Sequence, residues 1–490
     1  MMSPLEDNGN FQTVKSTFIM GSSSIINIGL GIIRHKIIAL LIGTAGIGLL
    51  GIYQSLSSLL LNIFGLGINE SGARQIAIFH GSKDKYSLAR VYISIKRIAL
   101  ITGLFGIIFI SIFSKELSLL TFKNSKHALE IILLSFSILL NNIFGAQTAL
   151  IQGSRKINYL AKINALGPFW GTLFSLPLIY FFRMKAVVSY LIVMSATNLI
   201  SSWYYKRKIE LSEVRINWAN SINQGIPLIK LGSALMIGTN ISFGISYLVR
   251  LLIIKGLGLD AAGIFQASSI FSSIYVGIIL KSMATDFYPR LSAISENHNE
   301  SNKLVNQQIE AGLLLGAPGI LLTLAFAPIL MVILYSKDFI VGFNILRWQI
   351  LGVMLQVITW PLGYIFRAKA AGQLFVITEL FYGICYLSTT WIGMKLFGLS
   401  GIGIAFFASN LLYLGLVYPI VHTKYDFSFD HNTLRKGIMF FSVAIISLLT
   451  LKLIPSHFFI VNIPLLLAIS FYSYKKLNLS AWFKRIRQKN

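Results

Sequence analysis

The sequence predicts an all-α membrane protein that crosses the bilayer many times. Of its 490 residues, 55% are hydrophobic and only 12% are charged, and the mean hydropathy is +0.72. A soluble domain carries about 25% charged residues. The apolar residues also form uninterrupted blocks, as at 105–113, 131–140 and 320–327. Such blocks are typical of helices that are surrounded by lipid.

Fourteen apolar windows are long enough to span a membrane, because a spanning helix needs about 20 mostly apolar residues. They lie at 15–42, 46–68, 98–114, 128–151, 163–182, 186–205, 231–254, 262–283, 310–335, 344–366, 374–394, 399–421, 438–454 and 457–474. An even number of spans places both ends of the chain on the same side of the membrane.

The basic residues predict which side that is. The chain has 42 Lys and Arg residues against 17 Asp and Glu residues, a formal net charge of +25. The cations lie between apolar spans rather than along one stripe, so they indicate anionic lipid headgroups and the positive-inside rule rather than nucleic acid. The most basic segments, at 74–97, 206–230 and 484–489, predict that both termini are cytoplasmic.

Several kinds of site have no signature in the sequence. Cys385 is the only cysteine, which excludes a disulfide framework and a cysteine-based metal site. No Gly-x-x-x-x-Gly-Lys-Ser/Thr motif is present, and the seven histidines are scattered. We therefore expect no catalytic residues, no metal site and no cofactor. The first apolar run lacks a basic leader and a cleavage site, so we expect a retained helix.

The sequence contains an internal repeat. A shift of 212 residues aligns Gly-Ile-Gly-Leu-Leu-Gly-Ile-Tyr-Gln at 46–54 with Gly-Leu-Asp-Ala-Ala-Gly-Ile-Phe-Gln at 258–266. Chance similarity between Gly- and Ile-rich segments is the alternative to duplication. The offset covers six helices, so both halves keep one orientation, as in parallel-repeat transporters. We expect two parallel six-helix repeats around a central cavity, plus an extra C-terminal helix pair.

The spans and the repeat together predict how the chain is divided. The expected parts are a cytoplasmic N-terminal tail at 1–14, an N-terminal lobe at 15–215, a C-terminal lobe at 216–425, the extra helix pair at 426–476 and a basic cytoplasmic tail at 477–490.

Cations inside the spans are the first candidate site, because a charge at a helix centre costs about 2.5–3.5 kcal/mol. Arg34, His35 and Lys36 interrupt the first span, and Arg250 interrupts 245–254. The 212-residue offset places Arg250 within about one helical turn of the triplet. Two such helices facing one cavity would bind a diphosphate. The alternatives are a triplet that ends its helix in a periplasmic loop, and an Arg250 that reaches the outer headgroups.

Glu379 is the clearest carboxylate inside a span, and with His35 it is a candidate for ion coupling. Its alternative is a position near a helix end, facing the interface. Polar side chains within spans either line a sugar-binding cavity or bond neighbouring helices, and the second role is commoner. They are Asn141, Asn142, Gln147, Asn198 and Asn240.

A wider pattern joins these residues. It includes Lys15-Ser16-Thr17, Lys36, Leu41, Gly43, Gly46-Ile47-Gly48, Tyr53-Gln54, Leu66-Gly67-Ile68, Ser71 and Arg74-Gln75-Ile76-Ala77, then Arg250, Gly258, Ala262-Gly263-Ile264-Phe265-Gln266-Ala267 and Tyr288-Pro289-Arg290-Leu291-Ser292. This pattern, over most of 12–420, resembles the polysaccharide transporter family, specifically O-antigen flippases of the Wzx type. These belong to the multidrug/oligosaccharidyl-lipid/polysaccharide (MOP) exporter superfamily. Fourteen spans rather than twelve is a departure from that family.

The resemblance implies a V-shaped two-lobe fold in the bacterial inner membrane. It implies a flippase that moves undecaprenyl-diphosphate-linked oligosaccharide, an O-antigen or similar unit of lipopolysaccharide biosynthesis, to the periplasmic leaflet by alternating access. Related lipid flippases bind the diphosphate with first-helix arginines, and Arg34, Lys36 and Arg250 are the matching candidates here. The implied partners are the lipid-linked oligosaccharide, membrane lipids, a glycan polymerase and a chain-length regulator.

Two other functions stay open. One is a drug or metabolite antiporter of the same superfamily, although a cationic-drug exporter needs carboxylates in its cavity and the excess here is positive. The other is a membrane-embedded glycan polymerase, which needs catalytic residues in a large periplasmic loop. The longest loops of this chain are expected to be cytoplasmic.

Overall fold

The computed structural model describes residues 4–275, 281–453 and 458–477, and every regular element in these ranges is a helix. The prediction of an all-α polytopic protein is confirmed. The described chain forms two compact units, Met1–Lys255 and Gly256–Asn490. The basic tail expected at 477–490 falls outside the described residues, apart from its first position.

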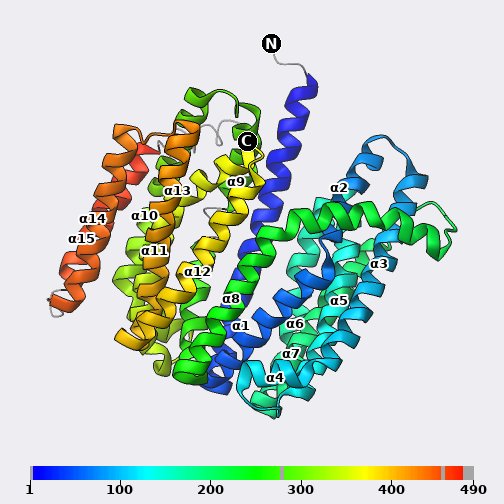
Figure 1. Ribbon diagram of the computed structural model, residues 1–490, viewed down its shortest axis with the longest axis horizontal. Helices are drawn as coiled ribbons and strands as arrows, with labels where there is room; N and C mark the ends of the chain where they lie inside the picture. The colour runs from blue at the N-terminus through cyan, green and yellow to red at the C-terminus, as the bar shows by residue number, and fades with distance from the viewer. Residues whose placement is uncertain (1–3, 276–280, 454–457, 478–490) are drawn as a thin grey trace. The chain divides into compact units, whose positions relative to one another are not determined.

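Unit 1 contains the first seven α-helices and the beginning of the eighth (Figure 1). They are α1 (Pro4–Gly65), α2 (Ile68–Gly81), α3 (Lys85–Ile112), α4 (Ser114–Phe122), α5 (Ala128–Gly153), α6 (Ile157–Phe182), the 3₁₀-helix η1 (Arg183–Ala186), α7 (Val187–Lys206) and the first part of α8 (Trp218–Tyr275). Because α1 begins at Pro4, most of the expected tail at 1–14 is helical and continuous with the first span.

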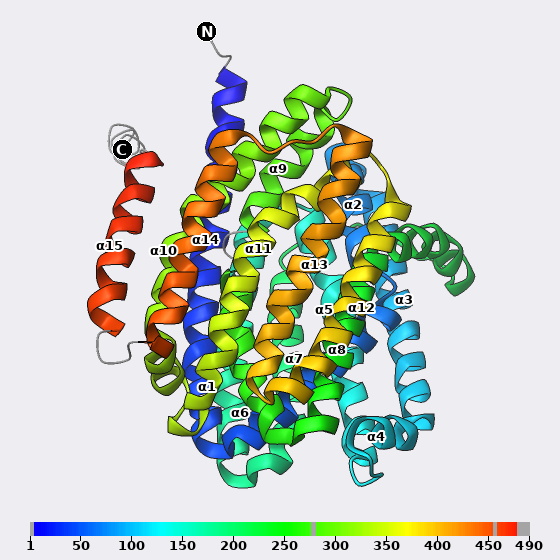
Figure 2. The same ribbon diagram turned by 60° about the vertical axis from the view of Figure 1, so that its left-hand side comes forward.

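Unit 2 contains the end of α8 and the remaining helices (Figure 2). They are α9 (Lys281–Ala293), α10 (His298–Leu334), the 3₁₀-helix η3 (Lys337–Gly342), α11 (Phe343–Ala368), α12 (Gly372–Phe397), α13 (Ser400–Tyr425), α14 (His431–Leu453) and α15 (Phe458–Lys476). The helices α14 and α15 run beside each other and beside α10, where the extra pair was expected.

The number of spans follows from helix lengths. Ten segments of the described chain are long and apolar enough to cross a membrane. Two of them, Ile26–Gly65 with 40 residues and Ile157–Lys206 with 50, are about twice the length that a 30 Å hydrocarbon core requires. Each is broken inside, at Gly43 and at Arg183. Each of these two segments is thus long enough to cross the membrane twice, and the count of fourteen spans stays a prediction.

Glycine breaks the first long helix of each unit. Gly43 in α1 has φ 66° and ψ −166°, and Gly258 in α8 has φ 89° and ψ 178°. These are conformations that residues with a Cβ rarely adopt. The repeat alignment paired Gly258 with Gly46, but Gly46 is helical and the matching break is Gly43. Gln54 therefore follows its break by three more residues than Gln266 does, which is nearly one helical turn.

The first part of α8 belongs to unit 1 because its side chains and backbone pack there. The hydroxyl groups of Tyr247 and Thr121 lie 2.7 Å apart. Gly232 approaches Gly67 so closely that a Cβ on either residue would meet the other's backbone within 3 Å. The compact units therefore divide at 255/256. The lobe boundary at 215/216, which follows the repeat rather than compactness, stays a prediction.

Candidate functional site

The basic triplet lies inside α1 and not in a loop, since helix continues from Lys36 to the break at Gly43. The Arg34 guanidinium points between two neighbouring helices of unit 1. Its Nη1 atom donates a hydrogen bond to Thr172 Oγ1 of α6 at 3.3 Å and lies 3.8 Å from Met194 Sδ of α7. The interpretation of the triplet as the end of a helix is therefore wrong.

Arg34 carries a charge without a compensating carboxylate among the residues that the structure describes. Its Nε atom is buried and has no hydrogen-bond partner there, and neither has Nδ1 of His35. Leaving a buried charge without a counter-ion costs several kcal/mol. Arg34 is thus a half-buried cation without a paired carboxylate in the described chain, and the half-buried Lys36 follows on the same helix.

Arg250 occupies the matching position on α8. Its Nη1 atom donates to the carbonyl oxygen of Ser246 at 3.0 Å and to Ser246 Oγ at 2.5 Å, one turn earlier on the helix. Arg250 lies eight residues before Gly258, and Arg34 lies nine before Gly43. At 1.5 Å per residue these separations are about 12 and 14 Å. Both arginines thus lie at similar distances from the break in their own helix.

Glu379 lies in unit 2 with neighbours that the sequence did not indicate. It is half-buried on α12, and Arg367 of α11 lies near enough to attract its charge. The guanidinium carbon of Arg367 is 4.3 Å from the ring centre of Phe375. Glu379 comes seven residues after the start of α12, about 10 Å along the axis, which favours the position near a helix end. Its coupling role stays a prediction.

A polar hollow of 670 Å³ opens between α2 and α5 of unit 1. Its polar lining consists of Asn69, Glu70, Arg74, Asn141, Thr148, Gln152 and Arg155. Within the described chain, the side chains of Arg74 and Arg155 form no ion pair. Amide, hydroxyl, carboxylate and guanidinium groups in one hollow suit a ligand that bears hydroxyl groups.

The polar residues expected within the spans divide between two roles. Asn141 lines the polar hollow and also donates to Ser195 Oγ of α7 at 2.8 Å. Gln147 accepts a hydrogen bond from Ser202 at 2.6 Å and so joins α5 to α7. Asn142 is only 2% exposed, and neither atom of its amide has a partner among the described residues. The Oδ1 atom of Asn240 is also buried and has no hydrogen-bond partner among the described residues. Asn198 packs against Gly167.

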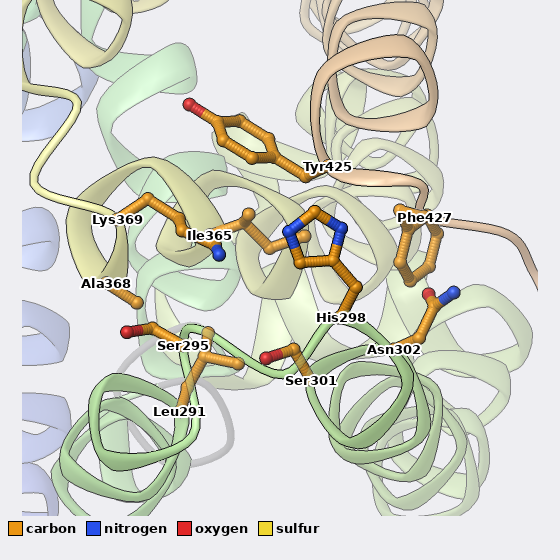
Figure 3. A pocket seen from close by; sticks show the side chains of 10 residues that line it. All are labelled: Leu291, Ser295, His298, Ser301, Asn302, Ile365, Ala368, Lys369, Tyr425 and Phe427. Carbon is orange, nitrogen blue, oxygen red and sulfur yellow. The ribbon is translucent and has the colours of Figure 1, made fainter.

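A small hollow in unit 2 is a structural joint rather than a binding site (Figure 3). Its volume is 20 Å³, about what one water molecule requires. His298 Nδ1 lies 3.0 Å from Asp426 Oδ2, and Asn302 donates to the carbonyl of Asp426 at 2.9 Å. These bonds tie the segment between α13 and α14 to the start of α10. No metal-binding group of three or more acidic, His or Cys residues occurs in the described chain.

Two polar clusters escaped the sequence analysis. Arg347 of α11 is 4% exposed, and its Nη2 atom donates to the carbonyl of Ser447 in α14 at 2.6 Å. In unit 1, the Tyr53 hydroxyl donates to Glu130, whose carboxylate is 2.5 Å from His127 Nδ1. In the sequence, Arg347 and Glu130 are single charges near span ends, and hydropathy does not tell whether such a charge points inward.

The sequence is similar to a known protein family and to two proteins of described function. The family described as "Polysaccharide biosynthesis protein" matches residues 37–341. The "Lipid III flippase" of Escherichia coli (strain K12) is 22% identical over 419 residues, which cover 82% of this chain and 96% of that protein. The protein of the same name from Shigella flexneri matches equally.

Two solved structures share the fold. "Lipid II flippase MurJ, inward closed conformation" has a TM-score of 0.71 at 15% identity, with 94% of this chain and 99% of that chain covered. An inward-facing multidrug resistance MATE family transporter of the MOP superfamily has a TM-score of 0.65 at 13% identity, with 82% and 98% covered. The fold is therefore that of the MOP superfamily.

Proposed function

The chain belongs to the polysaccharide biosynthesis protein family, and from this premise we propose that it is a flippase for a lipid-linked oligosaccharide. Support comes from the lipid III flippases, which match this chain over 96% of their own length. The observation that carries the proposal is Arg34, an intramembrane cation whose described surroundings contain no paired carboxylate. An anionic group of the substrate supplies the missing counter-ion.

The substrate in this proposal is an undecaprenyl-diphosphate-linked unit of a surface glycan, such as O-antigen. It moves from the cytoplasmic to the periplasmic leaflet of the bacterial inner membrane, and both termini of the chain are cytoplasmic. Arg34, Lys36 and Arg250 bind the diphosphate, because guanidinium groups match phosphate oxygens in pairs and an ammonium adds a point charge. The similar positions of Arg34 and Arg250 relative to Gly43 and Gly258 support this role.

The sugar occupies a hydrated space lined by polar groups. Asn141 and the other amide and hydroxyl groups of the hollow between α2 and α5 are suited to sugar hydroxyls. Transport proceeds by alternating access, with the polyprenyl chain in lipid. Glu379 and His35 are the candidates for coupling transport to an ion gradient. The alternative energy source for transport is consumption of the flipped product. A glycan polymerase and a chain-length regulator act next.

The experiment is deletion of the gene in its host, complemented with the wild-type gene, Arg34→Gln or Arg215→Gln. Arg215 is an exposed loop residue, so its variant removes the same charge without touching the spans. We expect deletion to strip the surface glycan and to leave single lipid-linked units in the cytoplasmic leaflet. At equal protein level, Arg34→Gln should lower the amount of lipid-linked units in the periplasmic leaflet at least about tenfold, because the substrate loses one charge-assisted contact. Arg215→Gln should complement fully.

Other outcomes separate the alternatives. If the deletion strain carries single units in the periplasmic leaflet that are not polymerised, the protein is a polymerase. If the surface glycan is intact and the strain instead accumulates a drug, the protein is an antiporter. Equal complementation by Arg34→Gln and the wild type would show that Arg34 does not bind the substrate, whatever the substrate is.

A further inference from the structure

A second hollow in unit 1, distinct from the polar hollow between α2 and α5, lies where α3 begins and α7 ends. Its volume is 450 Å³. Its walls come from α3, α5, α7, the segment after α7 and the start of α8. The side chains that matter for its chemistry are Tyr92, Lys96, Arg97, Leu100, Ile143, Lys206, Ser212 and Trp218.

This hollow has an excess of positive charge. Lys96, Arg97 and Lys206 line it, and none of its lining residues is acidic. Lys96 lies near enough to Lys206 for the two ammonium groups to repel each other. Glu213 directly follows Ser212, yet no ion pair joins it to these cations in the described part of the chain. The charge of the hollow is therefore available to an anion.

Two of the three cations, Arg97 and Lys206, are held in place by neutral partners. Arg97 Nη1 donates to the carbonyl of Ile216 and to Ser221 Oγ, both at 2.8 Å, and its guanidinium carbon is 4.5 Å from the ring centre of Trp218. Lys206 Nζ lies 5.2 Å from the ring centre of Tyr92. Hydrogen bonds and cation–π contacts of this kind orient a cation without neutralising it. The binding geometry is thus preorganised for an incoming anion.

The hollow has apolar as well as charged lining residues. Lys96 and Arg97 directly precede the apolar window at 98–114, and Lys206 ends α7, so these cations lie at the level of lipid headgroups. Leu100, one helical turn after Lys96 on α3, and Ile143 of α5 are apolar residues of the same lining. A ligand that fits both parts has a phosphate at one end and a hydrocarbon chain at the other.

We propose that this hollow binds the phosphate group of a lipid, between Lys96, Arg97 and Lys206, with the lipid chain against Leu100 and Ile143. The inference does not depend on the flippase function. The phosphate comes from one of two sources, an anionic phospholipid of the surrounding leaflet or a polyprenyl diphosphate. The chemistry of recognition is the same for both, and the experiment distinguishes them.

The test uses native mass spectrometry of the purified full-length protein with phosphatidylglycerol, and with phosphatidylcholine of the same acyl chains as the neutral comparison. Lys96→Gln/Lys206→Gln removes two cations from the hollow. Lys85→Gln/Lys156→Gln removes two exposed lysines that do not line it. We expect the first double variant to bind phosphatidylglycerol about 25-fold more weakly than the wild type, about fivefold for each charge. The second should bind like the wild type.

Two substitutions at one position distinguish a loss of binding from a loss of folding. Ser212→Glu adds a carboxylate to the hollow, whereas Ser212→Gln adds a side chain of the same size without charge; Ser212 lies in a non-helical segment and is half-buried. Only the Glu variant should lose phosphatidylglycerol. The proposal is overturned if phosphatidylglycerol binds the Lys96→Gln/Lys206→Gln variant as tightly as the wild type, or if the wild type does not prefer it to phosphatidylcholine.

Titration with undecaprenyl diphosphate identifies the source of the phosphate. If it displaces phosphatidylglycerol from the wild type and is weakened by the same two substitutions, the hollow takes the polyprenyl diphosphate. If its binding is unaffected by them, the hollow takes a phospholipid. Failure of the flippase proposal would leave these outcomes intact, because the readout is lipid binding and not transport.

Discussion

At the scale of single residues, Asn306 of α10 shows how one buried amide fixes a connection. It is 1% exposed. Its Nδ2 atom donates to the carbonyl of Ser428 at 2.9 Å, and its Oδ1 atom accepts from the backbone N–H of Asp430 at 2.9 Å. The segment between α13 and α14 thus gains two hydrogen bonds from a side chain that cannot reach water.

Asn306→Leu should therefore destabilise the protein. The substitution keeps the branched shape of the side chain but strands a backbone carbonyl and a backbone N–H, a loss of about 1–3 kcal/mol for each group left unsatisfied. We expect a clear fall in apparent melting temperature of the purified protein in detergent. Gln307→Leu, at the exposed neighbouring position, should change stability by no more than about 0.5 kcal/mol. Equal melting of the two variants would mean that the amide contributes no net stability.

At the scale of helices, a close approach of two backbones in unit 1 joins the segment between α1 and α2 to α8. Gly67 has φ 61° and lies against the backbone of Gly232, which is helical. Gly232→Ala therefore tests the close approach without any change in allowed conformation. A Cβ there would meet the carbonyl group of Gly67, and backbone cannot rotate away as a side chain can.

We expect Gly232→Ala to destabilise the protein by about 1–3 kcal/mol, the range for overpacking. Gly244→Ala on the same helix is the matched control, because its nearest atom would be 4.0 Å away. Replacing that glycine should stabilise α8 by up to about 1 kcal/mol, from helix propensity. Thermal unfolding of both variants measures the difference. A stable Gly232→Ala protein would show that α8 moves away from Gly67 at low cost.

Comparison of the expected and observed helices shows what hydropathy can predict. It indicated the long apolar helices, of which ten segments of the described chain can cross a membrane, because a run of about 20 apolar residues depends on composition alone. It missed α2, whose polar residues give no apolar window, and it paired the wrong glycine with Gly258, since both Gly43 and Gly46 fit the pattern. It also missed Arg347, because the direction in which a side chain points depends on packing between helices.

At the scale of the whole molecule, the distribution of cations predicts which side of the membrane each connecting segment faces. Two lysines, one before α3 and one after the following α4, make a matched pair for testing it. Lys83 precedes α3, Lys123 follows α4, both are exposed, and both have φ 59°. Replacing either one by Cys therefore carries the same backbone strain. Cys385 is the only native cysteine, so Cys385→Ser gives a clean background.

We expect a membrane-impermeant maleimide to label Lys123→Cys in intact cells, and Lys83→Cys only after the inner membrane is permeabilised. The positive-inside rule places the basic segment at 74–97 in the cytoplasm, and α3 is long enough, with 28 residues, to carry the chain to the other side. The reverse labelling would invert every span, with Gly43 and Gly258 on the cytoplasmic side and the basic segments outside. In that case the positive-inside rule would not explain the excess of Lys and Arg behind the net charge of +25.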